Sequence, residues 1–200
     1  GRMKRWLASP IRANVFLEIN MQLILHRLPR DEQLAFNRQR WAELLDDAEL
    51  ARHEFRIETN GAGQILMTPP AAGDHSNRQS VIILTIHNLL GGHPLPECPI
   101  STQDGVRAAD VGWYSDHRYE QVRGQIAFET APEIGVEVIS PRNTATEMND
   151  KRQLYFDAGA LEVWFCNIDG RMEFYEAKNP TEAISHSNLC PEFPVEISPT

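Results

Sequence analysis

The stretch GVEVISPRN, residues 135–143, is an apolar run that carries one acid and is interrupted by a proline. Its apolar residues between Gly135 and Pro141 are typical of a short buried strand. An ionised carboxylate at Glu137 would be costly in such a strand unless a partner binds it. Either the end of the strand is exposed to water, or Glu137 is bound.

The residues that follow predict a helix that packs on this strand. Thr144 and Glu147 have the spacing of a capping box, and Gly159 stands where a C-terminal cap belongs. Positions 148, 151, 155 and 158 form one stripe, which we expect to cover the sheet. Lys151 would then face inward, toward the end of the strand that holds Glu137. The alternative is that its chain extends past Tyr155 to solvent.

A second predicted strand also carries one acid in an apolar context. Asp104-Gly105 separates two strands, and the second, at about residues 108–114, contains Asp110. If this strand neighbours the one with Glu137, the two carboxylates can share a divalent cation, which would resolve the burial of Glu137. Lys151 could then orient a water nucleophile and stabilise charge on a phosphate.

The other segments have simpler patterns. A helix is predicted at residues 74–90, because a Gly-Gly pair at residues 91–92 can end it. His75 is the first residue on the face of this helix that is expected to point inward. Before this helix, the sequence predicts one or two amphipathic helices in residues 28–54 and a hairpin in residues 53–70. After it, we expect a proline-rich connection before Cys98 and, near the end of the core, a hairpin in residues 161–176 that turns at Asp169-Gly170.

Composition limits the classes of protein that fit this chain. Its 200 residues, 42% hydrophobic, can bury one sizeable core. We expect an N-terminal extension at 1–20, either non-native or poorly ordered, and a single domain at 21–200. A net charge of -9 argues against a broad basic surface, although it leaves room for a local groove. Three cysteines without a CxxC pair indicate neither a disulfide framework nor a zinc site, and they favour the reducing cytoplasm. The longest apolar stretch, around residues 81–86, is far shorter than a membrane span, so we expect a soluble protein.

The order of these elements resembles the restriction endonucleases of the Uma-two type, members of the PD-(D/E)XK nuclease superfamily. The resemblance rests on a hairpin, a helix with His75, a strand with Asp110, the strand VEVISP, a helix with Lys151 and the strand LEVWFCN. It covers about residues 34–176, which we take as the core of the domain, and its most specific part is 137–164.

The resemblance implies an α/β fold, restriction-endonuclease-like, with a mixed β-sheet flanked by α-helices in a single domain. It also implies a phosphodiester hydrolase site that uses Mg²⁺ or Mn²⁺, held by Asp110, Glu137 and the backbone carbonyl of Val138. His75 and Glu58 match a recurrent histidine and a recurrent acid, and we carry them over as supporting residues.

Two positions depart from the superfamily pattern. Ala109 replaces the proline before the first acid, a change that costs little because the role of that proline is conformational. Ile139 replaces the lysine expected two residues after the second acid. The resemblance implies that Lys151, on the following helix, supplies the ammonium instead.

Three functions follow as hypotheses. The first is a magnesium-dependent endonuclease that acts on nucleic acid, with DNA as the expected polymer, and that forms a homodimer. The second is a catalytically idle module that keeps the fold for binding or assembly. The third is a hydrolase of a smaller phosphate ester. Retention of Asp110, Glu137 and Lys151 together favours catalysis, because an idle site has no reason to keep an inward lysine.

Overall fold

The computed structural model describes residues 28–52, 55–68 and 70–197. The expected extension at residues 1–20 lies outside this part of the chain. Within it, no helix is long and apolar enough to cross a membrane.

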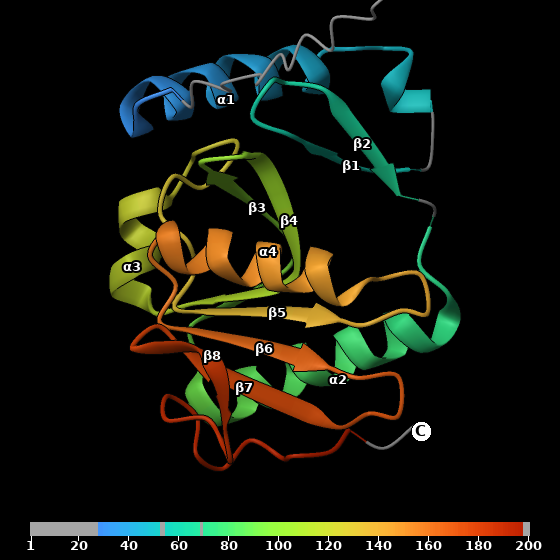
Figure 1. The fold of residues 1–200 in the computed structure, drawn as a ribbon, viewed down its shortest axis with the longest axis vertical. Coiled ribbons are helices and arrows are strands. Elements are labelled where there is room, and N and C mark those ends of the chain that lie inside the picture. The colour runs from blue at the N-terminus through green and yellow to red at the C-terminus, as the bar shows by residue number, and fades with distance from the viewer. Residues whose placement is uncertain (1–27, 53–54, 69, 198–200) are drawn as a thin grey trace, which may run out of the picture.

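One mixed sheet forms the centre of the molecule (Figure 1). Its strand order follows the chain, and the only parallel neighbours among its described strands are β5 and β6, which α4 connects. A parallel pair needs such a crossover, whereas antiparallel neighbours need only a turn. The strands are β3 (His93–Thr102), β4 (Gly105–Tyr114), β5 (Ile134–Val138), β6 (Glu162–Cys166), β7 (Met172–Glu176) and β8 (Asn179–Ile184), and the crossover helix is α4 (Ala145–Asp157).

Helices cover both faces of this sheet, which confirms the predicted fold class (Figure 1). On one face, α2 (Gly73–Leu90) packs Ile82 and Ile86 against Val136 and Trp164. On the other face, Tyr155 and the rest of the buried stripe of α4 pack against β6. Because side chains alternate along a strand, Val136 on the α2 face leaves Glu137 on the α4 face.

A separate layer lies beyond the β3–β4 end of the sheet (Figure 1). It consists of α1 (Arg30–Leu45), the short helix η1 (Leu50–Arg52) and the antiparallel hairpin of β1 (Arg56–Thr59) and β2 (Ile65–Thr68). Side chains of β1 bind the backbone of β4: Ala108 N–H donates to Glu58 Oε1 at 2.9 Å, and Val106 N–H donates to Thr59 Oγ1 at 2.9 Å. The hairpin thereby carries Glu58 to the middle of β4.

Two details of the sheet differ from expectation. The residues before Cys98 are not a connection, because β3 begins at His93 and includes Pro94 and Pro96. The described part of β3 is an edge strand, so its outward-facing backbone needs no N–H groups and prolines are tolerated there. The sheet also continues past residue 176 with β8, and Phe193 and Ile197 from the following segment join the core under α2. The short helix α3 (Asp116–Val122), which follows β4, completes the fold.

Candidate active site

Asp110 lies where the pairing of β4 with β5 ends and where its pairing with β3 has a gap of one residue. Toward β5, the last paired residues are Val111 and Val136, and the same register would place Asp110 opposite Glu137. The Val138 N–H donates instead to Asp110 Oδ2 at 2.6 Å. Toward β3, no pair forms at Glu97, which has a left-handed φ of 48°. Such backbone strain in a non-glycine residue concentrates at functional sites.

Glu137 is buried and bound, which answers the question raised by its sequence context. Lys151 Nζ lies 3.3 Å from Glu137 Oε2, and the Tyr155 hydroxyl donates to Glu137 Oε1 at 2.6 Å. Gly135 lies beneath Tyr155, since a Cβ atom there would lie 3.4 Å from Cδ2 of the ring, in ordinary van der Waals contact. The ring therefore packs over the strand, and its hydroxyl reaches the acid two residues further on.

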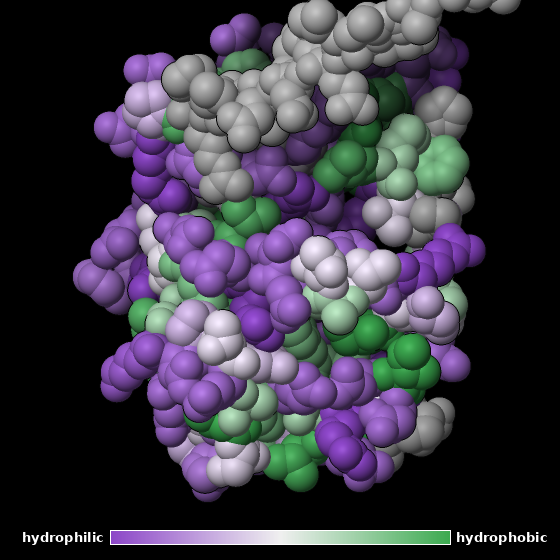
Figure 2. Space-filling view, in the orientation of Figure 1, coloured by the Kyte–Doolittle hydropathy of each residue, from purple (hydrophilic) through white to green (hydrophobic). Residues whose placement is uncertain are grey.

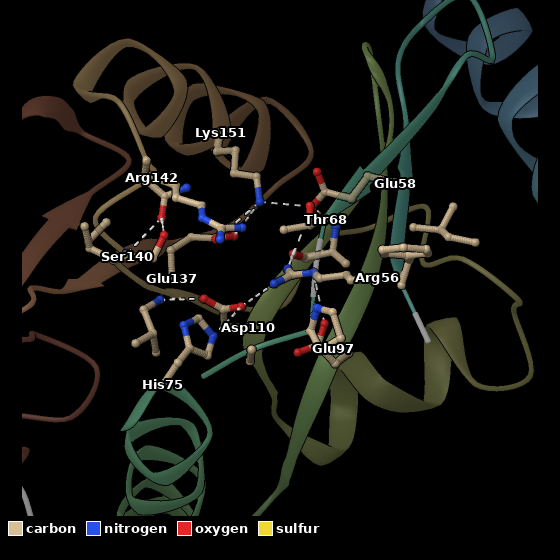
Figure 3. A pocket seen from close by; sticks show the side chains of 18 of the residues that line it. Arg56, Glu58, Thr68, His75, Glu97, Asp110, Glu137, Ser140, Arg142 and Lys151 are labelled. Atoms are coloured by element: carbon tan, nitrogen blue, oxygen red, sulfur yellow. Dashed lines mark hydrogen bonds and ion pairs between the residues drawn. The ribbon is translucent and has the colours of Figure 1, made fainter. Parts of the chain in front are cut away.

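Lys151 joins two acids that come from different parts of the chain. Its Nζ donates to Glu58 Oε1 at 2.9 Å as well as facing Glu137, and only 8% of the residue is exposed (Figure 3). The inward orientation predicted from the helical stripe is confirmed, and the alternative of an extended chain in solvent is wrong.

Two more basic side chains face Asp110. Arg56 Nη1 binds Asp110 Oδ1, and His75 Nε2 lies 3.3 Å from the same oxygen (Figure 3). Arg56 also binds the carbonyl of Ala108 and places its Nε 3.0 Å from Glu97 Oε2. The structure therefore brings together all five side chains expected from the sequence, and it adds Arg56, Glu97 and Tyr155.

The electrostatics of the two central acids differ. Burial raises the pKa of Glu137 to about 7, the charge of Asp110 adds to this rise, and Lys151 only partly opposes it. Burial also acts to raise the pKa of Asp110, but the hydrogen bond with His75 and the charge of Arg56 hold that pKa below its ordinary value. Glu137 is therefore the more easily protonated of the two acids.

The pKa values of the supporting groups follow from the same neighbours. Burial acts to lower the pKa of Lys151, but Glu137 and Glu58 outweigh it, so that pKa is raised and the ammonium is kept. Burial likewise acts to raise the pKa of Glu58, and the charge of Lys151 reverses the effect. The hydrogen bond with Asp110 raises the pKa of His75.

These residues lie at the floor of a cavity of about 1010 Å³ between the β1–β2 layer and the loop from β5 to α4. Its walls are largely apolar, with Trp41, Leu45, Phe55, Ile126 and Ile168 among the lining residues. In Figure 2 the outer surface of α4 is mostly hydrophilic, whereas hydrophobic side chains gather over the β1–β2 layer. The cavity is large enough to admit part of a substrate chain to the acids.

The chemistry of the donor set fits Mg²⁺ or Mn²⁺. Asp110 and Glu137 offer carboxylate oxygens, and the carbonyl of Val138 faces the same side of β5 as its N–H, toward Asp110. Within the described residues, no group of three or more His, Cys, Asp or Glu side chains is arranged to hold a metal ion. Mg²⁺ needs no such cage, since it is typically bound by one or two carboxylates together with waters and substrate phosphates.

Arg56 and Glu97 were not identified from the sequence as residues of the site. A pattern in the sequence could have indicated Arg56, but none indicates Glu97. Arg56 stands two residues before Glu58 on a predicted strand, so both side chains share one face. Glu97 lies in a proline-rich segment without periodicity, and only the break in β3 brings it to the site. Tyr155 lies on the stripe that the sequence predicts to cover the sheet, but helical spacing alone does not indicate that its hydroxyl binds an acid.

Comparisons with known proteins agree with this fold. A crystal structure of a "putative nuclease belonging to DUF820" from Anabaena variabilis ATCC 29413 superposes with a TM-score of 0.59, covering 70% of this chain and 86% of that one. At 17% identity, this likeness shows a shared fold. No curated protein matches the chain. The family model of Uma2, described as "Putative restriction endonuclease", matches residues 41–197, so the chain belongs to the Uma2 family.

Proposed function

We propose that this member of the Uma2 family is a metal-dependent endonuclease that hydrolyses phosphodiester bonds of DNA. One observation carries the proposal: two buried acids lie side by side where β4 and β5 part, with the Lys151 ammonium held against one of them. An acid pair with a fixed cation at the floor of a cavity is suited to metal-assisted hydrolysis of a phosphodiester.

Asp110, Glu137 and the Val138 carbonyl would hold Mg²⁺ or Mn²⁺. When bound, such a cation supplies positive charge against the phosphate and makes water a better nucleophile. The Val138 N–H and His75 hold the Asp110 carboxylate in one orientation, and the Tyr155 hydroxyl does the same for Glu137. The protein thus preorganises the oxygen ligands before substrate arrives.

Lys151 would stabilise the negative charge that develops on the phosphate. Glu58 and Glu137 keep its ammonium protonated and fixed, so little reorganisation is needed when the charge appears. Glu58 is itself held by the Ala108 N–H, which makes it a positioning residue for Lys151. A homodimer would place two such sites on the two strands of a duplex, an argument by analogy with other symmetric assemblies.

The test of this proposal is plasmid cleavage by the Lys151→Gln variant under one fixed concentration of Mg²⁺ and of salt. We expect its rate to fall by about a hundredfold or more relative to wild type, because a preorganised charge is lost at the developing anion. Lys178→Ala, which changes an exposed lysine in the turn before β8, is the matched control and should cleave at the wild-type rate.

A second variant tests the relocation of the lysine. Residues 137 and 139 point to the same side of the strand, and Ile139 lines the cavity. Adding Ile139→Lys to Lys151→Gln should therefore restore part of the activity. Equal cleavage by wild type and Lys151→Gln would exclude the lysine from catalysis, provided that circular dichroism shows both proteins folded. No cleavage by any protein would favour the idle module.

A further inference from the structure

Arg56 occupies one of the two carboxylate oxygens of Asp110. The first oxygen, Oδ2, accepts the Val138 N–H of β5. The second, Oδ1, binds Arg56 Nη1 and lies 3.3 Å from His75 Nε2. A cation that binds Asp110 through Oδ1 therefore meets the guanidinium that already holds this oxygen.

A guanidinium and a divalent cation on the same oxygen repel one another strongly. The site is buried, with Asp110 1% and Glu137 4% exposed, so solvent screens this repulsion only partly. Arg56 is always protonated, and it can relieve the repulsion only by moving away. Binding of the cation therefore competes with the Arg56–Asp110 contact.

Arg56 has other acids to bind when it leaves Asp110. Its Nε already lies 3.0 Å from Glu97 Oε2, and its Nη2 lies 3.8 Å from Glu58 Oε1. That Nε makes no aligned hydrogen bond within the described part of the chain, although it is buried. A small shift toward Glu97 would improve its hydrogen bonding while releasing Asp110. Glu97 itself is partly exposed, and its other oxygen, Oε1, accepts a hydrogen bond from Gln79 Nε2 at 3.1 Å.

We infer that Arg56 takes the place of the divalent cation at Asp110 in the metal-free protein, and that its displacement toward Glu97 sets the affinity of the site for metal. The inference rests on the proposed function, since it concerns the same acids. It assigns Arg56 a role in metal binding that is separate from contact with substrate.

The experiment measures Mn²⁺ binding by isothermal titration calorimetry to wild type and to Arg56→Gln, without nucleic acid. We expect the dissociation constant of the variant to be lower by a factor of at least about ten, because a charge that competes for Asp110 is removed. Arg52→Gln, which removes an exposed arginine paired with Glu49, is the control and should bind Mn²⁺ as wild type does. Asp110→Asn should abolish binding in either background.

Thermal unfolding provides a second measurement. It distinguishes competition with the metal from a purely structural role of Arg56, because a structural role alone would not change the stabilisation by Mn²⁺. Metal-free Arg56→Gln should melt at a lower temperature than wild type, whereas saturating Mn²⁺ should raise its melting temperature by more than that of wild type. If Arg56→Gln does not fold, Arg56→Lys keeps the charge but loses the bidentate fork, and it should bind Mn²⁺ more tightly than wild type by a smaller factor.

The outcomes separate the inference from the proposed function. Equal or weaker Mn²⁺ binding by the folded Arg56 variant, with binding by wild type intact, overturns the inference alone. Absence of Mn²⁺ binding by wild type and variant alike overturns it together with the metal-dependent function. Tighter binding by the variant, lost on Asp110→Asn, supports both.

Discussion

At the scale of single residues, a glycine allows close packing beside the acids. Gly112 on β4 packs against Cys98, since a Cβ atom there would lie 2.6 Å from the Cys98 sulfur. Its partner on β5, Gly135, lies beneath the Tyr155 ring, which carries the hydroxyl that binds Glu137. The sheet is therefore closely packed at this glycine pair, two residues from each acid.

This packing predicts that the cysteines are inert in the native protein. Cys98, Cys166 and Cys190 are all buried, and burial raises the pKa of Cys98 to about 12. At pH 8 a disulfide reagent such as DTNB should titrate no thiol in the native protein and three in guanidinium chloride. Modification of native protein at the rate of the unfolded chain would contradict the burial of these side chains.

The pKa of Cys98 also predicts a dependence of stability on pH. The folded state holds this proton more tightly than the unfolded state, in which the pKa is about 9.0. The contribution of Cys98 to stability is therefore full below about pH 9 and is lost as the pH rises toward about 12. Urea unfolding of wild type and Cys98→Ala across this range should show a steeper fall for wild type.

At the scale of elements, the loop after β5 turns the chain back so that α4 covers the strand. Ser140 N–H donates to Asn143 Oδ1 at 2.9 Å, and Asn143 N–H donates to the Ser140 carbonyl at 3.1 Å. The predicted capping box then starts the helix, since Glu147 N–H donates to Thr144 Oγ1 at 3.2 Å and the Glu147 side chain reaches the Thr144 N–H. The stretch SPRNT thus sets the position of Lys151 over Glu137.

Loss of this cap should destabilise the protein measurably. Thr144→Ala removes the acceptor for the Glu147 N–H, and we expect the free energy of unfolding to fall by about 1 kcal/mol. Thr146→Ala, at an exposed position inside the same helix, is the control and should change stability little. Urea denaturation of both variants makes the comparison, and equal values would mean that the cap does not stabilise α4.

At the scale of the whole molecule, one buried acid ties the C-terminal segment to the sheet. The Glu162 carboxylate accepts hydrogen bonds from Trp164 Nε1 at 2.7 Å, Ser187 Oγ at 2.7 Å, Asn188 N–H at 2.8 Å and Leu189 N–H at 2.9 Å. The segment beyond β8 then places Phe193 and Ile197 in the core beside α2. Glu162 is thus a structural acid, unlike the acids of the cavity.

Replacing this acid should loosen the C-terminal segment. Glu162→Gln keeps the shape of the side chain but turns one acceptor into a donor that faces N–H groups, and we expect a loss of about 2–4 kcal/mol. Hydrogen exchange at the amides of Asn188 and Leu189 should speed up more than exchange in β5. The exposed Glu182→Gln on β8 is the control, and a similar effect of both changes would contradict the assigned role.

The sequence by itself determined the local elements and the candidate acids. Periodicity of 2 and 3.6 residues, together with the capping box, indicated β5, α4 and the inward Lys151, because these features depend on neighbours a few residues away. The lone acid in each of two apolar strands and the inward stripe of the helix indicated one site with Asp110, Glu137 and Lys151, and the resemblance to a known family pointed to the same residues.

Contacts between distant segments were not accessible in this way. Three features depend on strand register and on packing between layers. They are the break in pairing at Glu97, the contact of Arg56 with Asp110, and the attachment of the residues beyond 176. Only the tertiary structure decides them, since no local pattern specifies which strand edge or which acid a side chain meets across the fold.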